Sequence, residues 1–187
     1  MRYILASKSP RRRELLGEII NDFEIVTKEV DESLPSEIHP RDGVEILAIR
    51  KGAAVAENLT PDCLIISSDT LVEIGGVALG KPNDKADAFN MLSLLSGKAH
   101  NVHTGVAIHY RGKVFSGVAT TAVYFREMSD KEICDYIDSG DPMDKAGSYG
   151  IQSGGGKFVD HIEGDYDTVV GLSVRLVKLL LDKATKI

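Results

Sequence analysis

The sequence of 187 residues predicts an α/β fold with a mixed β-sheet, and three features lead to that prediction. A short apolar run near the start leads through a proline-containing turn into a helical pattern. A second apolar run, residues 63–66, lacks the alternation of a half-buried strand, as expected of a central strand covered on both faces. Two long strand patterns flank Arg111-Gly112, which is typical of a hairpin. Together these features indicate a sheet with helices packed against it.

The first third of the chain is predicted to alternate short strands with helices. Ser9 suits the N-cap of the first helix and Pro10 its first position, where a missing N–H costs nothing and the fixed φ is already helical. The apolar strand that begins at Cys63 ends abruptly in Ser67-Ser68-Asp69-Thr70. The predicted elements are strands at residues 3–6, 23–27 and 63–66, helices at residues 11–20 and 41–58, and an acidic loop at residues 31–40.

The rest of the chain is predicted to hold a short hairpin, a helix, long strands and two further helices. Gly75-Gly76 turns the hairpin, and Asn83 or Asp84 caps the next helix. Residues 129–132 have capping-box spacing, and Gly140 stops the helix that follows. The other predicted elements are strands at residues 101–110, 113–126 and 158–162, a glycine-rich irregular segment at residues 141–157, and an amphipathic helix at residues 172–184.

Composition predicts one compact domain over residues 1–187. The chain carries 28 acidic and 22 basic side chains, a formal net charge of −6, and 43% hydrophobic residues. Such a hydrophobic content excludes a disordered chain. The acidic balance argues against a surface that coats nucleic acid in general, which would need a broad excess of Lys and Arg, and leaves local basic clusters open.

The two cysteines and the absence of long apolar runs bear on location. Cys63 and Cys134 lie outside any metal-binding spacing and are expected to be buried free thiols in a reducing compartment. No stretch reaches the ~18 apolar residues needed to span a bilayer, and no export signal is evident. We therefore expect a cytoplasmic protein that contacts no membrane.

The turn from Ser7 to Arg13 is a candidate anion site. A strand here runs into a helix whose first turn has free N–H groups, beside two serine hydroxyls and three consecutive arginines. Free amides and the helix dipole favour a phosphate, which an arginine can grip with two hydrogen bonds. At most two of the arginines can face one ligand. A solvated basic helix start is the alternative, and this segment alone does not decide between the two interpretations.

Asp69 and Lys51 are candidates for a charged site. Asp69 follows the most hydrophobic predicted strand, and open α/β sheets place ligands at the carboxyl ends of central strands. It is a candidate metal ligand or general base, with capping of the following turn as the alternative. Lys51 falls inside an apolar helical stripe, seven residues after Val44. It is either a cation for a ligand or a side chain whose stem packs on apolar surface while its ammonium reaches water.

Lys81 and Gln152 are further candidates for ligand contact. Residues 75–81 match the spacing of a phosphate-binding P-loop, but Pro82 stands where Ser or Thr would hold Mg²⁺, and the residue before a proline is disfavoured in a helix. A P-loop ATPase is therefore excluded, and Lys81 remains a candidate cation. Gln152 lies in the glycine-rich segment, which is either a flexible cover for a ligand or a plain surface turn. Its amide both donates and accepts, which suits the edge of a nucleobase.

The histidines do not suggest a metal centre. His100 and His103 are three positions apart in a predicted strand, so they face opposite sides. No Ser-His-Asp arrangement or nucleophilic-cysteine motif stands out. Metal-assisted attack by water is therefore the simplest reaction type.

Several segments of the chain, taken in order, resemble the motifs of one known family. They are LASKSPRRRELL (5–16), SSDTLVEIGGVALGKP (67–82), LSGKAHNVHTGVAI (95–108), DKAGSYGIQSGGGKFV (144–159) and VVGLS (169–173). On these motifs the whole sequence resembles the Maf-like nucleoside triphosphate pyrophosphatases, also called septum formation inhibitor proteins. It departs from the family pattern at Ser153, where glycine is frequent, at Asp167-Thr168, where Asn-Val is frequent, and at Ser173, where proline is usual.

The resemblance implies both a fold and a reaction. The implied fold is related to the inosine triphosphate pyrophosphatases, with an elongated mixed β-sheet flanked by helices and two lobes around a central cleft. The implied reaction is hydrolysis of dTTP and UTP, or of modified pyrimidine nucleotides, to the monophosphate and pyrophosphate. A divalent cation, Mg²⁺ or Mn²⁺, would assist the attack of water. Asp69-Thr70 and the Gln of Tyr-Gly-Ile-Gln are similar to the subgroup that acts on dTTP and UTP.

The resemblance also assigns roles to individual residues. Asp69 matches the catalytic carboxylate and, with Glu32, is expected to hold the metal. The expected substrate-binding residues are Ser7, Arg11, Arg12, Lys51, Thr70, Lys81 and Gln152. The expected partner is a small nucleoside triphosphate and not a nucleic acid polymer, and a homodimer is compatible with the sequence. The competing class is a non-catalytic nucleotide-binding regulator of cell division, which the family's older name suggests.

Overall fold

The computed structural model describes residues 1–186, and its internal contacts divide the chain into two compact units. Unit 1 is made of three segments, which are Met1–Thr70, Thr104–Ala119 and Gly171–Ile187. Unit 2 is made of Leu71–His103 and Thr120–Val170. The single domain expected over residues 1–187 stays a prediction.

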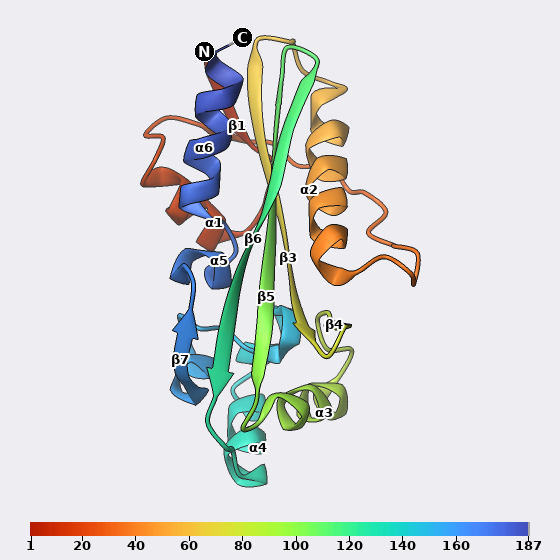
Figure 1. The fold of residues 1–187 in the computed structure, drawn as a ribbon, viewed down its shortest axis with the longest axis vertical. Coiled ribbons are helices and arrows are strands. Elements are labelled where there is room, and N and C mark those ends of the chain that lie inside the picture. Colours follow the sequence, from red (N-terminus) through yellow and green to blue (C-terminus); the bar gives the residue numbers. More distant parts are fainter. Residues whose placement is uncertain (187) are drawn as a thin grey trace. The chain divides into compact units, whose positions relative to one another are not determined.

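The strands form a seven-stranded mixed sheet (Figure 1). Its order is β2-β1-β3-β5-β6-β7, with β4 paired to β3 off this path. β1 runs parallel to both β2 and β3, whereas β4 is antiparallel to β3 and β7 is antiparallel to β6. The predicted mixed sheet is therefore confirmed. The strands are β1 Arg2–Leu5, β2 Glu24–Ile25, β3 Cys63–Ile74, β4 Val77–Leu79, β5 Ala99–Tyr110, β6 Lys113–Phe125 and β7 Val159–Glu163.

The helix caps that the sequence predicts are present in the structure, although the first helix ends at Gly17 and not at residue 20. Ser9 caps the first helix through Arg12 N, Asp84 caps the third, and Ser129 with Glu132 forms the predicted capping box. Gly140, at φ 78°, follows the fourth helix in the left-handed conformation that suits glycine. The helices are α1 Pro10–Gly17, α2 Pro40–Ala56, α3 Lys85–Leu95, α4 Asp130–Asp138, α5 Tyr166–Val170 and α6 Val174–Thr185, with short 3₁₀ helices at Asp141–Asp144, Ala146–Ser148 and Gly154–Phe158. The sequence patterns did not predict α5.

Strand β3 does not end at Ile66, so that prediction was wrong. The strand continues to Ile74 because the buried hydroxyls that follow Ile66 have backbone partners. Ser67 Oγ donates to the carbonyl oxygen of Ala48 at 2.7 Å, and Ser68 Oγ donates to that of Gly171 at 3.1 Å. Satisfied hydroxyls can be buried at little cost, so a polar stretch need not end a strand. Asp69 consequently lies inside β3 and not in the turn after it.

The cysteine prediction holds for one residue and fails for the other. Cys63 is buried at the start of β3 as a free thiol. Cys134 is a free thiol too, but it is exposed. It occupies the outer face of α4, whereas Ile133, Tyr136 and Ile137 occupy the inner face.

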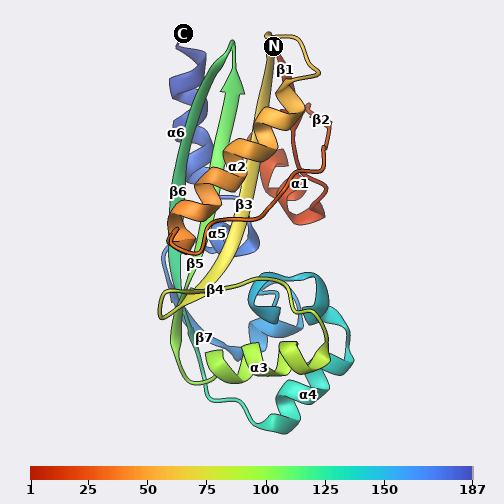
Figure 2. The ribbon, with the colours of Figure 1, turned by 90° about the vertical axis from the view of Figure 1, so that its right-hand side faces the viewer.

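In unit 1, helices cover both faces of the sheet. α2 lies on one face, and α6 with α1 lies on the other (Figures 1 and 2). α2 approaches β5 so closely that a Cβ added at Gly105 would overlap the carbonyl group of Val44. His109 Nε2, facing a carbonyl that can only accept, donates to Ile49 O at 3.1 Å. Burial lowers the pKa of His109, although this hydrogen bond opposes the shift.

Substituting Gly105 by alanine is expected to destabilise unit 1. The added Cβ meets rigid helix backbone, so α2 must shift, and the free energy of unfolding should fall by about 2–3 kcal/mol. Gly17→Ala is the matched control, because no atom lies within 4 Å of a Cβ there. That control should leave the stability unchanged or raise it by up to ~1 kcal/mol. Urea unfolding measures the free energy of unfolding of each variant. Equal values for Gly105→Ala and Gly17→Ala would contradict the close packing of α2.

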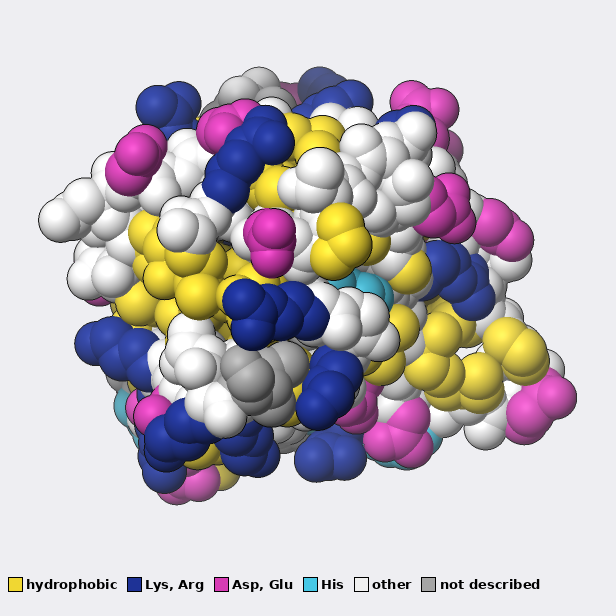
Figure 3. Space-filling model, turned by 90° about the horizontal axis from the view of Figure 1, so that it is seen from above, with side chains coloured by type: hydrophobic (Ala, Val, Ile, Leu, Met, Phe, Trp, Pro, Cys, Tyr) yellow, Lys and Arg dark blue, Asp and Glu magenta, His cyan; other side chains and the backbone are white. Residues whose placement is uncertain are grey.

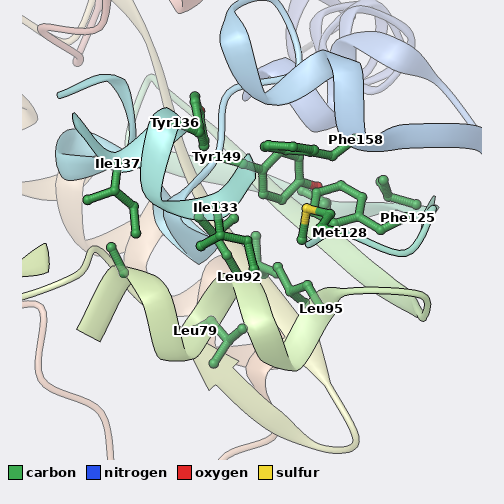
Figure 4. Packing of buried hydrophobic residues seen from close by; sticks show 14 residues of the cluster. Leu79, Leu92, Leu95, Phe125, Met128, Ile133, Tyr136, Ile137, Tyr149 and Phe158 are labelled. Atoms are coloured by element: carbon green, nitrogen blue, oxygen red, sulfur yellow. The ribbon is translucent and has the colours of Figure 1, made fainter. Parts of the chain in front are cut away.

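Unit 2 has its own core, in which α3, α4 and aromatic side chains meet (Figure 4). Tyr149 stands against Phe125 at 4.8 Å between ring centroids, and Tyr136 stands against Phe158 at 5.3 Å, both edge to face. His100 is buried beside this cluster, with Nε2 2.8 Å from Tyr149 Oη. Burial lowers the pKa of His100 to about 4, although the charge of Glu73 opposes the shift. His100 is therefore neutral at pH 7.

The depressed pKa of His100 predicts a loss of stability in acid. The unfolded chain takes up the proton near pH 6.5, whereas the folded chain resists it down to about pH 4. The stabilisation is complete above pH 6.5 and is lost as the pH falls toward 4, by about 3 kcal/mol in all. Urea unfolding between pH 7 and pH 4.5 should give a shallower pH dependence for His100→Gln than for the wild type. Parallel curves for the two proteins would contradict the buried neutral imidazole.

The surface carries charges of both signs. On the face shown in Figure 3, Lys and Arg side chains alternate with Asp and Glu side chains and with small hydrophobic areas. Within residues 1–186, no helix is both long and apolar enough to cross a membrane.

Candidate active site

The candidate site of unit 1 begins where β1 ends. The register of β1 with β3 stops at Leu5 opposite Ile66, and Ala6 N adds one more hydrogen bond to Ile66 O at 2.8 Å. The chain then turns at Ser7 into α1. The next stretch of β3 carries Asp69 and Thr70, so the start of α1 lies beside them. Asp69 therefore lies near the end of β1 but not at the end of β3, where the sequence pattern placed it.

Arg12 is held in place by three hydrogen bonds. Its Nε donates to the carbonyl oxygen of Gly171 at 2.8 Å, Nη1 to Ser7 Oγ at 3.4 Å and Nη2 to Thr70 Oγ1 at 3.2 Å. Burial lowers the pKa of Arg12, while the charge of Asp69 opposes that shift. The guanidinium remains a cation because its ordinary pKa is so high. The three hydrogen bonds fix this cation at the N-terminus of α1.

Of the other two arginines of the run, one matches Arg12 in burial and one does not. Arg11 is half-buried in the first turn of α1. Arg13 is exposed and lines a surface hollow with Glu14 and Phe23. That at most two arginines face one ligand stays a prediction.

Lys51 joins two carboxylates. Its Nζ lies 2.5 Å from Asp69 Oδ1 and 2.8 Å from Glu32 Oε1. The side chains of Lys51 and Asp69 are only 18% and 9% exposed, whereas that of Glu32 is 61% exposed. The ammonium therefore pairs with carboxylates and is not a surface lysine extended into water. The capping alternative for Asp69 is wrong as well, because Asp69 is part of a strand.

Close packing of α2 on the sheet places Lys51. The residue after it, Gly52, lies against Ser67 and His109, and a Cβ at this position would overlap both side chains. Ser67 Oγ also bonds the carbonyl oxygen of Ala48 in the preceding turn of α2. These contacts set how closely α2 approaches β3. They therefore also set the distance from Lys51 to Asp69.

Thr104 and Gly171 belong to the site, although the sequence analysis did not assign them. Thr104 Oγ1 lies 2.9 Å from Thr70 Oγ1. The carbonyl oxygen of Gly171 accepts from Arg12, Ser68 and Thr70. Gly171 has φ 128°, a conformation that favours glycine. Its place in the Val-Val-Gly-Leu-Ser motif was the only sequence signal for it.

Lys81 and Gln152, the remaining candidates, belong to unit 2. Lys81 is exposed just after β4. Gln152 is exposed in a turn closed by a 3.2 Å hydrogen bond from Ser153 N to Gly150 O. Their roles in ligand binding stay predictions.

The side chains around Lys51 fit a divalent cation in type and number. Mg²⁺ is usually held by one or two carboxylates together with phosphate oxygens of the substrate. Asp69 and Glu32 both reach the ammonium of Lys51, so their oxygens converge on one small volume. Among residues 1–186, no three His, Cys, Asp or Glu side chains form a preformed metal site. The arrangement therefore suits a cation that arrives with phosphate ligands.

The fold and site define an α/β protein with basic groups at a helix N-terminus beside paired carboxylates, a combination suited to a phosphorylated ligand and a cation. Comparison with known proteins specifies the family. The chain belongs to the family described as Maf-like protein, whose model matches residues 2–184.

Two similar bacterial proteins are called dTTP/UTP pyrophosphatase. The one from Bacillus anthracis (strain CDC 684 / NRRL 3495) is 49% identical over 178 residues, which cover 95% of this chain and 93% of the relative. The one from Bacillus cereus (strain ATCC 10987 / NRS 248) is 50% identical, covering 95% of this chain and 87% of the relative. The solved structure of the Staphylococcus aureus Ham1 protein matches with a TM-score of 0.50 at 15% identity, covering 67% of this chain and 72% of that one. This last similarity concerns the fold alone.

Removing the Lys51 ammonium is expected to destabilise the protein through Asp69. Lys51→Met leaves a nearly buried carboxylate without its cation, so the free energy of unfolding should fall by about 1–3 kcal/mol. Adding Asp69→Asn to that variant should recover part of the loss, since an amide is cheaper to bury than an unpaired charge. Glu32→Gln is the control, and its exposed side chain predicts a change within about 0.5 kcal/mol. Additive losses in the double variant would contradict the pairing.

Proposed function

We propose that this chain is a nucleoside triphosphate pyrophosphatase that hydrolyses dTTP and UTP to the monophosphate and pyrophosphate. The observation that carries the proposal is the grouping of Lys51, Asp69 and Glu32 beside the partly buried guanidinium of Arg12. Relatives named dTTP/UTP pyrophosphatase, about half identical over 95% of the chain, support the choice of reaction and substrate.

The basic groups of the site would bind the triphosphate. Arg12 is fixed at the N-terminus of α1, where the positive end of the helix dipole attracts phosphate oxygens. Arg11 adds a second guanidinium from the same turn, and Ser7 adds a hydroxyl. Lys81 is proposed as a further cation on the substrate. Because hydrogen bonds already hold Arg12, little ordering of its side chain is required when a triphosphate binds.

Asp69 and Glu32 would hold a divalent cation, Mg²⁺ or Mn²⁺, together with phosphate oxygens. When bound, such a cation supplies Lewis acidity at the phosphate and lowers the pKa of a bound water. Both carboxylates now pair with Lys51. Lys51, whose ammonium lies next to both carboxylates, would be the nearest cation to the departing phosphates.

The reaction itself needs a base and a stabilised leaving group. In the proposed step, Asp69 accepts a proton from water as the water oxygen bonds to the α phosphorus. The bond from the α phosphorus to the bridging oxygen breaks, and its electron pair leaves with pyrophosphate. Lys51 and Arg12 offset the charge that develops on that leaving group.

Base selection is proposed to involve Gln152 and Thr70. The Gln152 amide carries a donor and an acceptor and so can complement one edge of a pyrimidine. Its exposed position in a turn leaves that amide accessible to a ligand. A base that leaves a polar group of the site without a partner is disfavoured by about 1–3 kcal/mol.

Asp69→Asn is expected to abolish turnover without unfolding the protein. The amide is close in size to the carboxylate but accepts no proton at neutral pH, so pyrophosphate release should fall by at least ~10²-fold. The assay incubates canonical nucleoside triphosphates with Mg²⁺ or Mn²⁺ and measures monophosphate, pyrophosphate and inorganic phosphate separately. Asp62→Asn, an exposed carboxylate, is the control and should retain full activity.

Three outcomes of this assay would contradict the proposal. Full activity of Asp69→Asn would remove the catalytic assignment. Stepwise release of inorganic phosphate would indicate a phosphatase. Nucleotide binding without turnover in the wild-type protein would favour the regulator of cell division. Chelation of the metal should stop pyrophosphate release reversibly if the cation assists the reaction.

A further inference from the structure

Gln152 lies at the corner of a turn that is fixed at both ends. Ser153 N donates to Gly150 O at 3.2 Å, which makes residues 150–153 a β-turn with Ile151 and Gln152 at its two central positions. Next to the turn, Tyr149 is buried with its hydroxyl 2.8 Å from His100 Nε2. The exposed side chain of Gln152 therefore projects from an anchored backbone.

Asp141 connects the two ends of this turn. Its Oδ2 accepts from Ser153 Oγ at 2.7 Å and from Tyr136 Oη at 2.6 Å. Tyr136 Oη in turn accepts from Gly150 N at 3.2 Å. Asp141 Oδ1 accepts from Lys145 Nζ at 3.0 Å, which balances the carboxylate charge. One carboxylate thus holds the residue before Ile151 and the residue after Gln152.

The glycines around the turn serve close packing against the same groups. Figure 4 shows Tyr136, Tyr149 and Phe158 in the core of unit 2. A Cβ at Gly154 would come within 2.9 Å of the Tyr136 ring, and one at Gly155 would come equally close to Tyr136 Oη. A Cβ at Gly150 would come within 2.6 Å of the Lys145 side chain. The glycine-rich segment is therefore packed on Tyr136 and Lys145, which differs from a plain surface turn.

We propose that Asp141 is a positioning residue for base selection, because it holds the turn that presents Gln152 through both Ser153 and the Tyr136 hydroxyl. The inference rests on the proposed function, in which Gln152 reads the base. Asp141 itself acts only through the turn. Its effect should therefore appear in the choice between bases and should depend on the presence of the Gln152 amide.

The test measures selectivity, the ratio of kcat/KM for UTP to kcat/KM for GTP. Asp141→Asn weakens both arms of the network, and Ser153→Ala removes one arm without altering the core. Asp141→Asn is expected to reduce selectivity about tenfold, and Ser153→Ala to reduce it less, because a loosened turn no longer fixes the amide. Asp135→Asn, an exposed carboxylate on α4, is the matched control and should change nothing.

Two further measurements separate positioning from general damage. Hydrogen exchange at the amides of Gly150 and Ser153 should become faster in Asp141→Asn and in Ser153→Ala, and not in Asp135→Asn. In a Gln152→Ala background, Asp141→Asn should cause no further loss of selectivity, because the amide that it positions is gone. The exchange measurement does not depend on activity, and Ser153→Ala keeps the test valid if Asp141→Asn fails to fold.

The outcomes distinguish this inference from the function on which it rests. A wild-type protein that releases no pyrophosphate from any nucleotide overturns the proposed function. An active and selective wild-type protein whose selectivity survives both Asp141→Asn and Ser153→Ala overturns this inference alone. A loss of selectivity of equal size with and without Gln152 also overturns it, since Asp141 would then act by another route.

Discussion

The pairing of Lys51 with Asp69 is the interaction on which the site of unit 1 depends. A carboxylate that is only 9% exposed inside a strand is costly unless a cation meets it. That cation comes from α2, which must lie close to the sheet to deliver it. Glycines at positions 52 and 105 permit this approach, because each faces atoms that a Cβ would overlap. The two glycines that allow α2 to pack closely on the sheet therefore also bring Lys51 within reach of Asp69.

Arg12, the second cation of the site, is held by the segment that precedes the last helix. Arg12 bonds the carbonyl oxygen of Gly171, which also accepts from hydroxyls of β3. Ser173 then caps α6 through Leu176 N. Ser173 thus supports a helix start, since serine is a good N-cap. The C-terminal segment contributes to the site through its backbone, which hydropathy patterns do not report.

In unit 2, the network around Asp141 explains how a glycine-rich segment can hold Gln152, the proposed recognition residue, in a fixed turn. Glycine composition alone is compatible with a flexible cover or a surface turn. The structure instead uses the glycines for close contact with Tyr136, whose hydroxyl links the segment to Asp141. A side chain that discriminates between ligands benefits from such a fixed backbone, because less entropy is lost when the ligand binds.

Sequence patterns were enough to predict the class of fold, most helices and several of their caps. They were also enough to suggest the family and the candidate residues Ser7, Arg12, Lys51 and Asp69. These follow from local periodicity, cap chemistry and ordered motifs, which need no knowledge of distant contacts. Three features became visible only in the folded chain. Strand β3 continues through Asp69, Cys134 is exposed, and Thr104 and Gly171 contact the residues of the site. The physical reason is that these features depend on hydrogen bonds and packing between residues far apart in the chain, and strand register and helix approach set those contacts.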